Sequence, residues 1–141
     1  MDSLQAALHS LPHGQAFRFL DRVLSLDPGH AATAEYTVRG DEPFLAGHFP
    51  GEPLFPGVLL IEAGAQLAGV VARSSAGGSK SRLRLTALRA VKIFGTARPG
   101  ETLHFEARLL GTLGKLIQAQ ATASIGPRVV LQAELTLSEE A

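Results

Sequence analysis

Two side chains in this sequence have the chemistry of an acid–base pair, and they stand fourteen residues apart. His48 lies in a segment rich in glycine and proline, residues 47–53, where rigid turns hold a side chain in place against a ligand. Glu62 lies in an apolar run, residues 58–72, whose only other polar side chain is Gln66. Burial among Val, Leu, Ile and Ala raises the pKa of a carboxyl group, which suits a general acid. A neutral imidazole nearby suits a general base.

The start of the apolar run offers a third catalytic element. Residues 56–58, Pro-Gly-Val, open a helix without a Ser, Thr, Asp or Asn cap immediately before it. We therefore expect the amides of Gly57 and Val58 to point at a carbonyl oxygen, which the glycine allows to approach closely. Gln66 follows Glu62 by four residues and shares its helix face, where it either orients the carboxylate or fills a polar niche.

The elements around these residues predict an α+β fold. A helix over 58–72 that is apolar on nearly every face needs cover on more than one side, which a curved antiparallel sheet provides. Three segments alternate apolar and polar residues with a period of two, as half-buried strands do: 102–109, 117–124 and 131–137. The other predicted elements are strands over 17–26, 32–38 and 83–94, a helix over 3–8 capped by Ser3, a loop over 40–57 and a flexible connection over 74–81.

Three groups of residues together resemble the 3-hydroxyacyl-acyl-carrier-protein dehydratases, a FabZ-like group within the hotdog-fold superfamily. They are the His-Phe-Pro-Gly, Pro-x-x-Pro-Gly-Val and Glu-Ala-x-Ala-Gln elements of residues 48–66, Leu11-Pro12-His13 with the later Phe19-Leu20-Asp21-Arg22-Val23, and the Pro-Gly-Glu turn of residues 99–101. The resemblance covers about residues 10–138. It implies that residues 1–141 form a single hotdog domain, that two chains pair into a homodimer, and that dimers assemble further, for example into a trimer of dimers.

The resemblance also implies a reaction. A (3R)-3-hydroxyacyl thioester, carried on the phosphopantetheine of an acyl carrier protein, loses water to give the trans-2-enoyl thioester in fatty acid, related lipid or polyketide synthesis. His48 is the expected base and Glu62 the expected acid, supplied by different subunits, and no cofactor is needed. The expected substrate contacts are Gly57, Val58, Gln66, Phe49 and Gly64.

The sequence departs from the family pattern in ways that bear on substrate choice. Gly64 stands where the family typically has a larger residue, often Met, and a glycine within a helix costs about 1 kcal/mol relative to alanine. Our hypothesis is that Gly64 widens or reshapes the acyl tunnel. Residues 89–94 match the family's tunnel-lining segment only loosely. His13 is interpreted as structural, and the remaining histidines as surface residues: His9, His30 and His104.

The formal charge is zero, with 13 basic and 13 acidic residues, but the distribution is uneven. Residues 63–100 hold no acidic residue and seven basic ones: Arg73, Lys80, Arg82, Arg84, Arg89, Lys92 and Arg98. A basic face attracts an acidic partner, and acyl carrier proteins are acidic; the alternative is an ordinary solvated surface. A neutral chain with few aromatic residues argues against a nucleic-acid partner.

Two other functions stay open. An acyl-CoA thioesterase of the same fold would direct a carboxylate and a water at the ester carbonyl, without His48 as a base. A non-catalytic acyl-binding subunit would keep the fold without turnover. A metal site has little support, since His48 and Glu62 have no third ligand clustered with them. The absence of cysteine excludes disulfides and thiol catalysis. The first residues do not resemble a signal peptide, and the apolar run over 58–72 is too short and too polar to cross a bilayer, so we expect a cytoplasmic protein.

Overall fold

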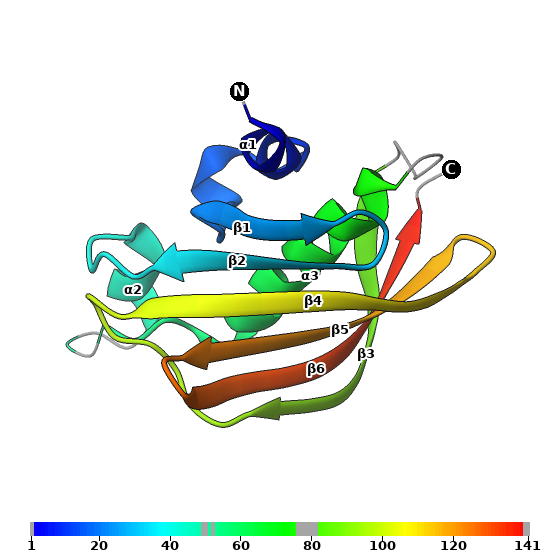
Figure 1. Cartoon of the computed structure of the whole chain (residues 1–141). Coiled ribbons are helices and arrows are strands. Elements are labelled where there is room, and N and C mark those ends of the chain that lie inside the picture. The colour runs from blue at the N-terminus through cyan, green and yellow to red at the C-terminus, as the bar shows by residue number, and fades with distance from the viewer. Residues whose placement is uncertain (1, 49–50, 52, 76–81, 140–141) are drawn as a thin grey trace.

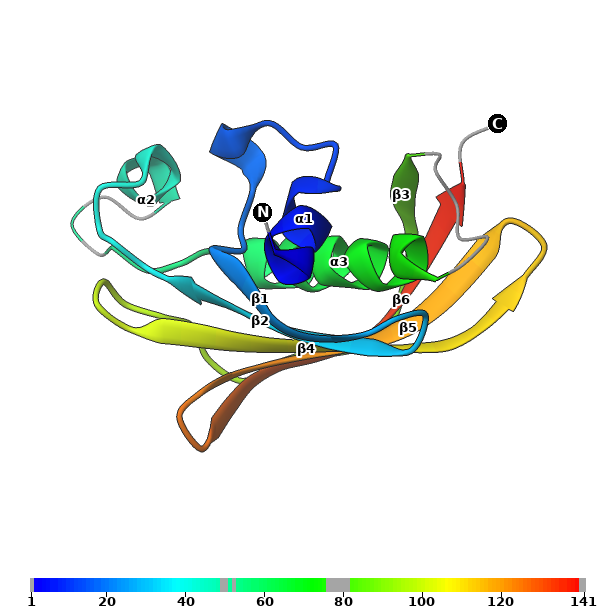
Figure 2. The ribbon, with the colours of Figure 1, turned by 45° about the horizontal axis from the view of Figure 1, so that its top comes forward.

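The computed structural model describes residues 2–48, 51, 53–75 and 82–139. In it a curved antiparallel sheet wraps around one long helix, α3 (Gly57–Ser74) (Figures 1 and 2). The sheet has six strands in the order β1-β2-β4-β5-β6-β3. Their bounds are β1 (Arg22–Asp27), β2 (Ala31–Thr37), β3 (Leu83–Ile93), β4 (Thr102–Leu113), β5 (Leu116–Ile125) and β6 (Arg128–Glu139). The α+β hotdog architecture predicted from the sequence is confirmed.

The inner face of the sheet is built from the three strands whose period-two pattern was clearest. Alternate residues point at α3 and are buried, while the residues between them are polar and mostly face solvent. The buried set comprises Leu103, Phe105 and Ala107 of β4, Ile117, Ala119, Ala121 and Ala123 of β5, and Leu131, Ala133, Leu135 and Leu137 of β6. Many of these side chains are alanines, so the helix lies close to the sheet.

The close approach is tightest at Gly64 in the middle of α3. A Cβ atom added to this glycine would lie 2.8 Å from the Cβ of Ala121 on β5. The packing of helix on sheet therefore accounts for a glycine here, in spite of its cost to the helix. By length and composition α3 is apolar enough to cross a membrane, but 67% of it is buried within the domain. Its apolar character is that of a core helix.

Three details of the predicted elements are wrong. The first helix, α1 (Ser3–His9), is capped by Asp2, whose carboxylate accepts from the amide of Gln5 at 2.7 Å, and not by Ser3. The predicted loop over 40–57 contains a short helix, α2 (Pro43–His48), which begins at a proline, a residue that fits the first turn of a helix. The first strand begins at Arg22, because a 3-10 turn, η1 (Gln15–Phe17), precedes it. Most of the predicted flexible connection, residues 76–81, lies outside the described residues.

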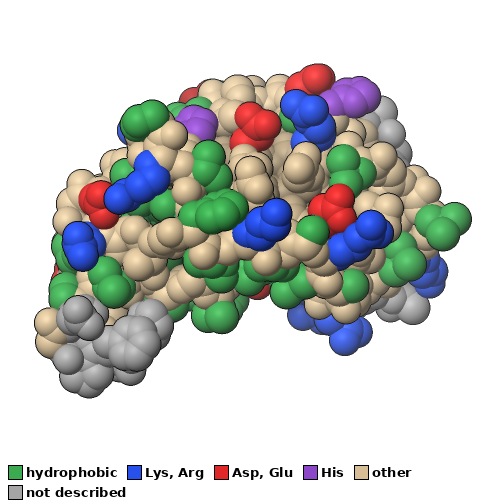
Figure 3. Space-filling view, turned by 90° about the horizontal axis from the view of Figure 1, so that it is seen from below, with side chains coloured by type: hydrophobic (Ala, Val, Ile, Leu, Met, Phe, Trp, Pro, Cys, Tyr) green, Lys and Arg blue, Asp and Glu red, His purple; other side chains and the backbone are tan. Residues whose placement is uncertain are grey.

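Strand β3 forms one edge of the sheet and is exposed along nearly its whole length. It pairs with β6 on one side only, and its register shifts twice, with Ala90 at a positive φ of 52°. Large apolar side chains are exposed on β3 and next to it: Leu85, Leu88, Ile93, Phe94 and Val58. Figure 3 views the molecule from below Figure 1, the side on which β3 lies, and hydrophobic and basic side chains are interspersed on that surface.

Candidate active site

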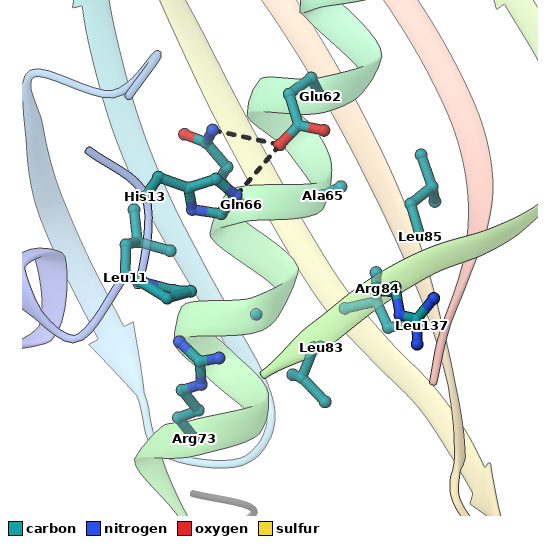
Figure 4. Close-up of a pocket in the computed structure, with 12 residues that line it drawn as sticks. Leu11, His13, Glu62, Ala65, Gln66, Arg73, Leu83, Arg84, Leu85 and Leu137 are labelled. Atoms are coloured by element: carbon teal, nitrogen blue, oxygen red, sulfur yellow. Dashed lines mark hydrogen bonds and ion pairs between the residues drawn. The ribbon is translucent and has the colours of Figure 1, made fainter. Parts of the chain in front are cut away.

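Glu62 and Gln66 lie one turn apart on a face of α3 that turns away from the sheet (Figure 4). The Gln66 amide Nε2 donates to Glu62 Oε2 at 3.1 Å and to the carbonyl of Phe17 at 2.8 Å. Its Oε1 accepts from the amide of Phe19 at 3.0 Å. Gln66 is only 2% exposed, so these bonds fix its amide, and the amide in turn holds the carboxylate. Gln66 thus both contacts Glu62 and fills a polar niche.

The same bonds explain why the chain is not a strand before Arg22. The carbonyl of Phe17 and the amide of Phe19 form their hydrogen bonds with the side chain of Gln66 on α3. These two backbone groups therefore do not pair with a neighbouring strand. The segment that carries the Leu11-Pro12-His13 motif is thereby held against α3.

His13 reaches the same carboxylate oxygen, with Nε2 3.5 Å from Glu62 Oε2. Its ring stacks near that of Phe17, with 6.1 Å between centroids, and in the described part of the structure its buried Nδ1 has no hydrogen-bond partner. Burial lowers the pKa of His13, and this outweighs the opposite effect of Glu62, so the ring is neutral at pH 7. From the sequence, His13 was interpreted only as structural, and its place in the family's opening motif was the one signal that linked it to the site.

A groove of about 200 Å³ opens beside Glu62 and follows α3 toward its C-terminal end (Figure 4). Its floor is one face of the helix, formed at helical spacing by Ala65, Gly69 and Arg73. A Cβ atom added to Gly69 would meet nothing within 4 Å, so small residues keep this floor open. The walls are Leu11, Pro12 and His13 on one side, and Leu83, Arg84, Leu85 and Leu137 on the other. Glu62 and Arg73 mark the two ends.

The other predicted site residues are placed as follows. His48 is the last residue of α2, but its side chain, like the whole of Phe49, lies outside the described part of the structure. Gly57 is the first residue of α3, preceded by Pro56, which provides no side-chain cap, and Val58 is 70% exposed. Gly64 faces the sheet and is not among the described residues that line the groove. The roles of these five residues in binding or catalysis stay predictions.

The basic residues of the predicted docking face separate into two groups. Arg73 and Arg84 line the groove, and Arg82 lies just before β3 at the same end. Farther away, Arg89 forms an ion pair with Glu134 at 3.4 Å, and the Arg98 amide donates to Glu101. Lys92 lies on β3 and Lys80 falls outside the described residues. Basic charge therefore gathers at the Arg73 end of the groove.

Comparison with known proteins agrees with this geometry. Residues 11–134 match the family model of the FabA-like domain, so the chain belongs to the FabA-like family, whose fold it shares. Its relatives include the 3-hydroxyacyl-[acyl-carrier-protein] dehydratase FabZ of Chloroflexus aggregans, 34% identical over 135 residues that cover 96% of this chain and 94% of the relative. The FabZ of Zymomonas mobilis is 36% identical over 135 residues, which cover 94% of this chain and 85% of the relative. These relatives are hydro-lyases, and the chain belongs to that class of enzyme.

Solved structures support the same fold. The dehydratase heterocomplex ApeI:P from Xenorhabdus doucetiae contains a chain that matches with a TM-score of 0.78 at 22% identity, over 96% of this chain and 91% of that one. Zebra fish thioesterase superfamily member 2 matches with a TM-score of 0.72 at 15% identity, over 95% of this chain and 91% of that one. At such low identity the two likenesses show the architecture alone.

Proposed function

We propose that this protein removes water from a 3-hydroxyacyl thioester carried by acyl carrier protein. The observation that carries the proposal is a single carboxylate, Glu62, held by a buried amide at the end of an apolar groove in a FabA-like chain. His48 takes the proton from Cα, the electron pair forms the new double bond, and the C–O bond at C3 breaks. Glu62 protonates the departing hydroxyl, which leaves as water.

The contacts of Glu62 favour one oxygen for this proton. Gln66 donates to Oε2, and an oxygen that accepts a donated hydrogen bond is the poorer place for a proton. A neutral His13 that carries its proton on Nε2 directs that N–H toward the same oxygen, Oε2. Figure 4 shows the other oxygen, Oε1, directed away from both partners. Oε1 is therefore the oxygen that delivers the proton, and Gln66 and His13 are positioning residues.

The amides at the start of α3 would stabilise the negative charge that develops on the thioester oxygen. Charge develops on the thioester oxygen when Cα loses its proton, and preorganised N–H donors stabilise such charge strongly. Gly57 and Val58 begin a helix that no described side chain caps, and the first amides of a helix have no acceptor within it. Phe49, in the same motif as His48, would contact the acyl thioester.

The enzyme would act as a homodimer. An exposed edge strand invites pairing with another strand, and β3 carries exposed Ile93, with Phe94 59% exposed directly after it and Val58 close by on α3. A second copy paired along this edge would cover these side chains and bring its own His48 to Glu62. Light scattering on the purified protein should give the mass of a dimer or of an assembly of dimers; a monomer would contradict this part of the proposal.

The carrier protein would dock on the basic residues of β3 that lie toward the start of α3, where the thioester enters. Ile93 of β3 lies 3.2 Å from a Cβ atom added to Gly57, so Lys92 and Arg89 are the basic residues of β3 at this end, and positive charge there attracts an acidic carrier protein. We place the protein in the cytoplasm, where acyl carrier protein would supply its substrate.

The reaction is tested by mass spectrometry of 3-hydroxyacyl-carrier-protein thioesters incubated with the enzyme. We expect the wild type to remove one water and the His48→Ala variant to remove none. Cleavage of the thioester to a free acid would instead identify a thioesterase. An unchanged substrate, on the carrier protein or on coenzyme A, would point to a non-catalytic acyl-binding role.

A further inference from the structure

A second space adjoins the groove at its Arg73 end. A second cavity, of about 540 Å³, lies between α1 and the C-terminal half of α3, and Pro12 and Arg73 line both spaces. The walls of this second cavity are mainly small or apolar: Ala6, Ala7, Leu26, Pro28 and Val70. Its polar lining is Ser3, Ser10, Ser74, Arg73 and Arg82. The groove and the larger space therefore adjoin at Pro12 and Arg73, with the Arg73 guanidinium at the junction.

The chemistry of the groove between its two ends suits a hydrocarbon chain. Beyond the polar cluster of Glu62, His13 and Gln66, the lining residues before Arg73 are apolar or glycine except for Arg84, and Ala65 and Gly69 leave room over the helix. Eleven residues separate Glu62 from Arg73, which is about 16 Å along a helix axis. An extended chain covers that distance in about a dozen bonds. A substrate whose C3 atom lies at Glu62 can thus reach Arg73 with the far end of a long acyl chain, of about fifteen carbons.

Arg73 places a positive charge at the end of this mainly apolar groove. Its side chain is half-buried, its Nη1 donates to the carbonyl of Ser10 at 2.9 Å, and burial lowers its pKa. The bond to Ser10 fixes the guanidinium where the two spaces join, and Figure 4 shows it on the groove side of α3. Arg82 adds a second positive charge to the far space. A methyl-ended chain would have to bring hydrocarbon against this charge, which is unfavourable, whereas a carboxylate would pair with it.

We propose that the acyl chain of the preferred substrate ends in a carboxylate, which Arg73 binds where the groove meets the second cavity. This inference rests on the proposed dehydratase function and names its substrate class. The guanidinium fork matches a carboxylate in two parallel hydrogen bonds, which gives selectivity as well as affinity. The same charge disfavours binding of an ordinary fatty acyl chain of equal length. Its methyl end would displace water from the guanidinium without forming a hydrogen bond in return.

The test compares two 3-hydroxyacyl thioesters of equal length on the same carrier protein, one ending in a carboxylate and the other in a methyl group. We expect the wild type to have the higher kcat/KM for the carboxylate-ended substrate. Arg73→Gln should lower that value about tenfold to a hundredfold and leave the methyl-ended substrate unchanged or improved. Arg73→Lys should retain part of the preference. Arg108→Gln, on the exposed face of β4, is the matched control and should leave both values unchanged.

The outcomes separate this inference from the function on which it rests. Equal losses on both substrates in Arg73→Gln would overturn the inference, since Arg73 would then act on the shared phosphopantetheine or on the fold. A wild-type preference for the methyl-ended substrate would also overturn it, while the dehydratase function would stand. Dehydration of neither substrate by the folded wild type would instead remove the proposed function itself. Thermal unfolding of each variant establishes that it is folded.

Discussion

Two glycines five residues apart on α3 show how differently the two faces of this helix are used. At Gly64 an added Cβ atom would lie 2.8 Å from Ala121, because this face packs directly on the sheet. At Gly69 an added Cβ atom would meet nothing within 4 Å, because this face opens into the groove. The first glycine is needed by the fold and the second leaves space for a ligand. Substitutions on the sheet face should therefore change stability, and substitutions on the groove face should change activity.

The largest effect is expected on the groove face at Glu62. Glu62→Gln keeps the shape of the side chain and removes the proton that the leaving hydroxyl needs, so kcat should fall by about 10²–10⁴. The thermal midpoint should change little, because the Glu62 side chain is 24% exposed and does not belong to the packed core. Steady-state kinetics and calorimetry on the same preparation measure both. A variant that unfolds at a much lower temperature would show that Glu62 is structural.

The sheet face should respond in the opposite way. Gly64→Met places a long side chain where even a Cβ atom is too close to Ala121, and overpacking of this kind costs about 1–3 kcal/mol. Denaturant unfolding should show this loss of stability. The sequence suggested that Gly64 shapes the acyl tunnel, and the same variant tests that hypothesis. A stable Gly64→Met protein with an altered chain-length preference would support it and contradict the division of the two faces.

A smaller and more selective effect is expected at the second glycine. Gly69→Leu should fill the groove between Glu62 and Arg73 without a clash, since the Cβ atom has room. Activity on short 3-hydroxyacyl thioesters should persist, while activity on chains long enough to reach Arg73 should fall about tenfold, the effect of a few misplaced methylenes. Equal activity on short and long chains would show that the acyl chain takes another route.

The smallest effect concerns pH and His13. Burial lowers the pKa of His13 below its usual 6.5, so below about pH 6.5 the unfolded chain binds more protons than the folded one. This histidine therefore reduces stability as the pH falls through 6.5 toward its folded pKa. His13→Gln should lose less stability between pH 7.5 and 5.5 than the wild type does in denaturant unfolding. Parallel pH profiles for the two proteins would contradict the shift.

Local patterns predicted the fold well because β4, β5 and β6 each bury one face. The alternation in these strands showed which residues point inward, and the apolar run of α3, interrupted only by Glu62 and Gln66 over residues 58–72, showed that this helix is covered by the sheet. Helix spacing likewise predicted the contact of Gln66 with Glu62, because residues four apart share a face. Each of these features depends on neighbours in the sequence.

Features that depend on distant residues could not be predicted in the same way. The contact of His13 with Glu62 spans 49 positions, and it exists because the carbonyl of Phe17 and the amide of Phe19 bond to Gln66. The close approach of Gly64 to Ala121 could not be predicted either, because nothing in the sequence indicates that Ala121 lies opposite this glycine. The cap at Asp2 was missed for a simpler reason, since both Asp2 and Ser3 are good cap residues.

The central claim is that His48 of one subunit and Glu62 of the other form one dehydratase site. It is tested most directly by mixing two inactive variants, His48→Ala and Glu62→Gln, after dissociation and reassembly. In a mixed dimer one site would combine the intact His48 of one chain with the intact Glu62 of the other, so removal of water should return. Activity that stays absent in verified mixed dimers would contradict the shared site, and activity in either variant alone would show that its residue is not required.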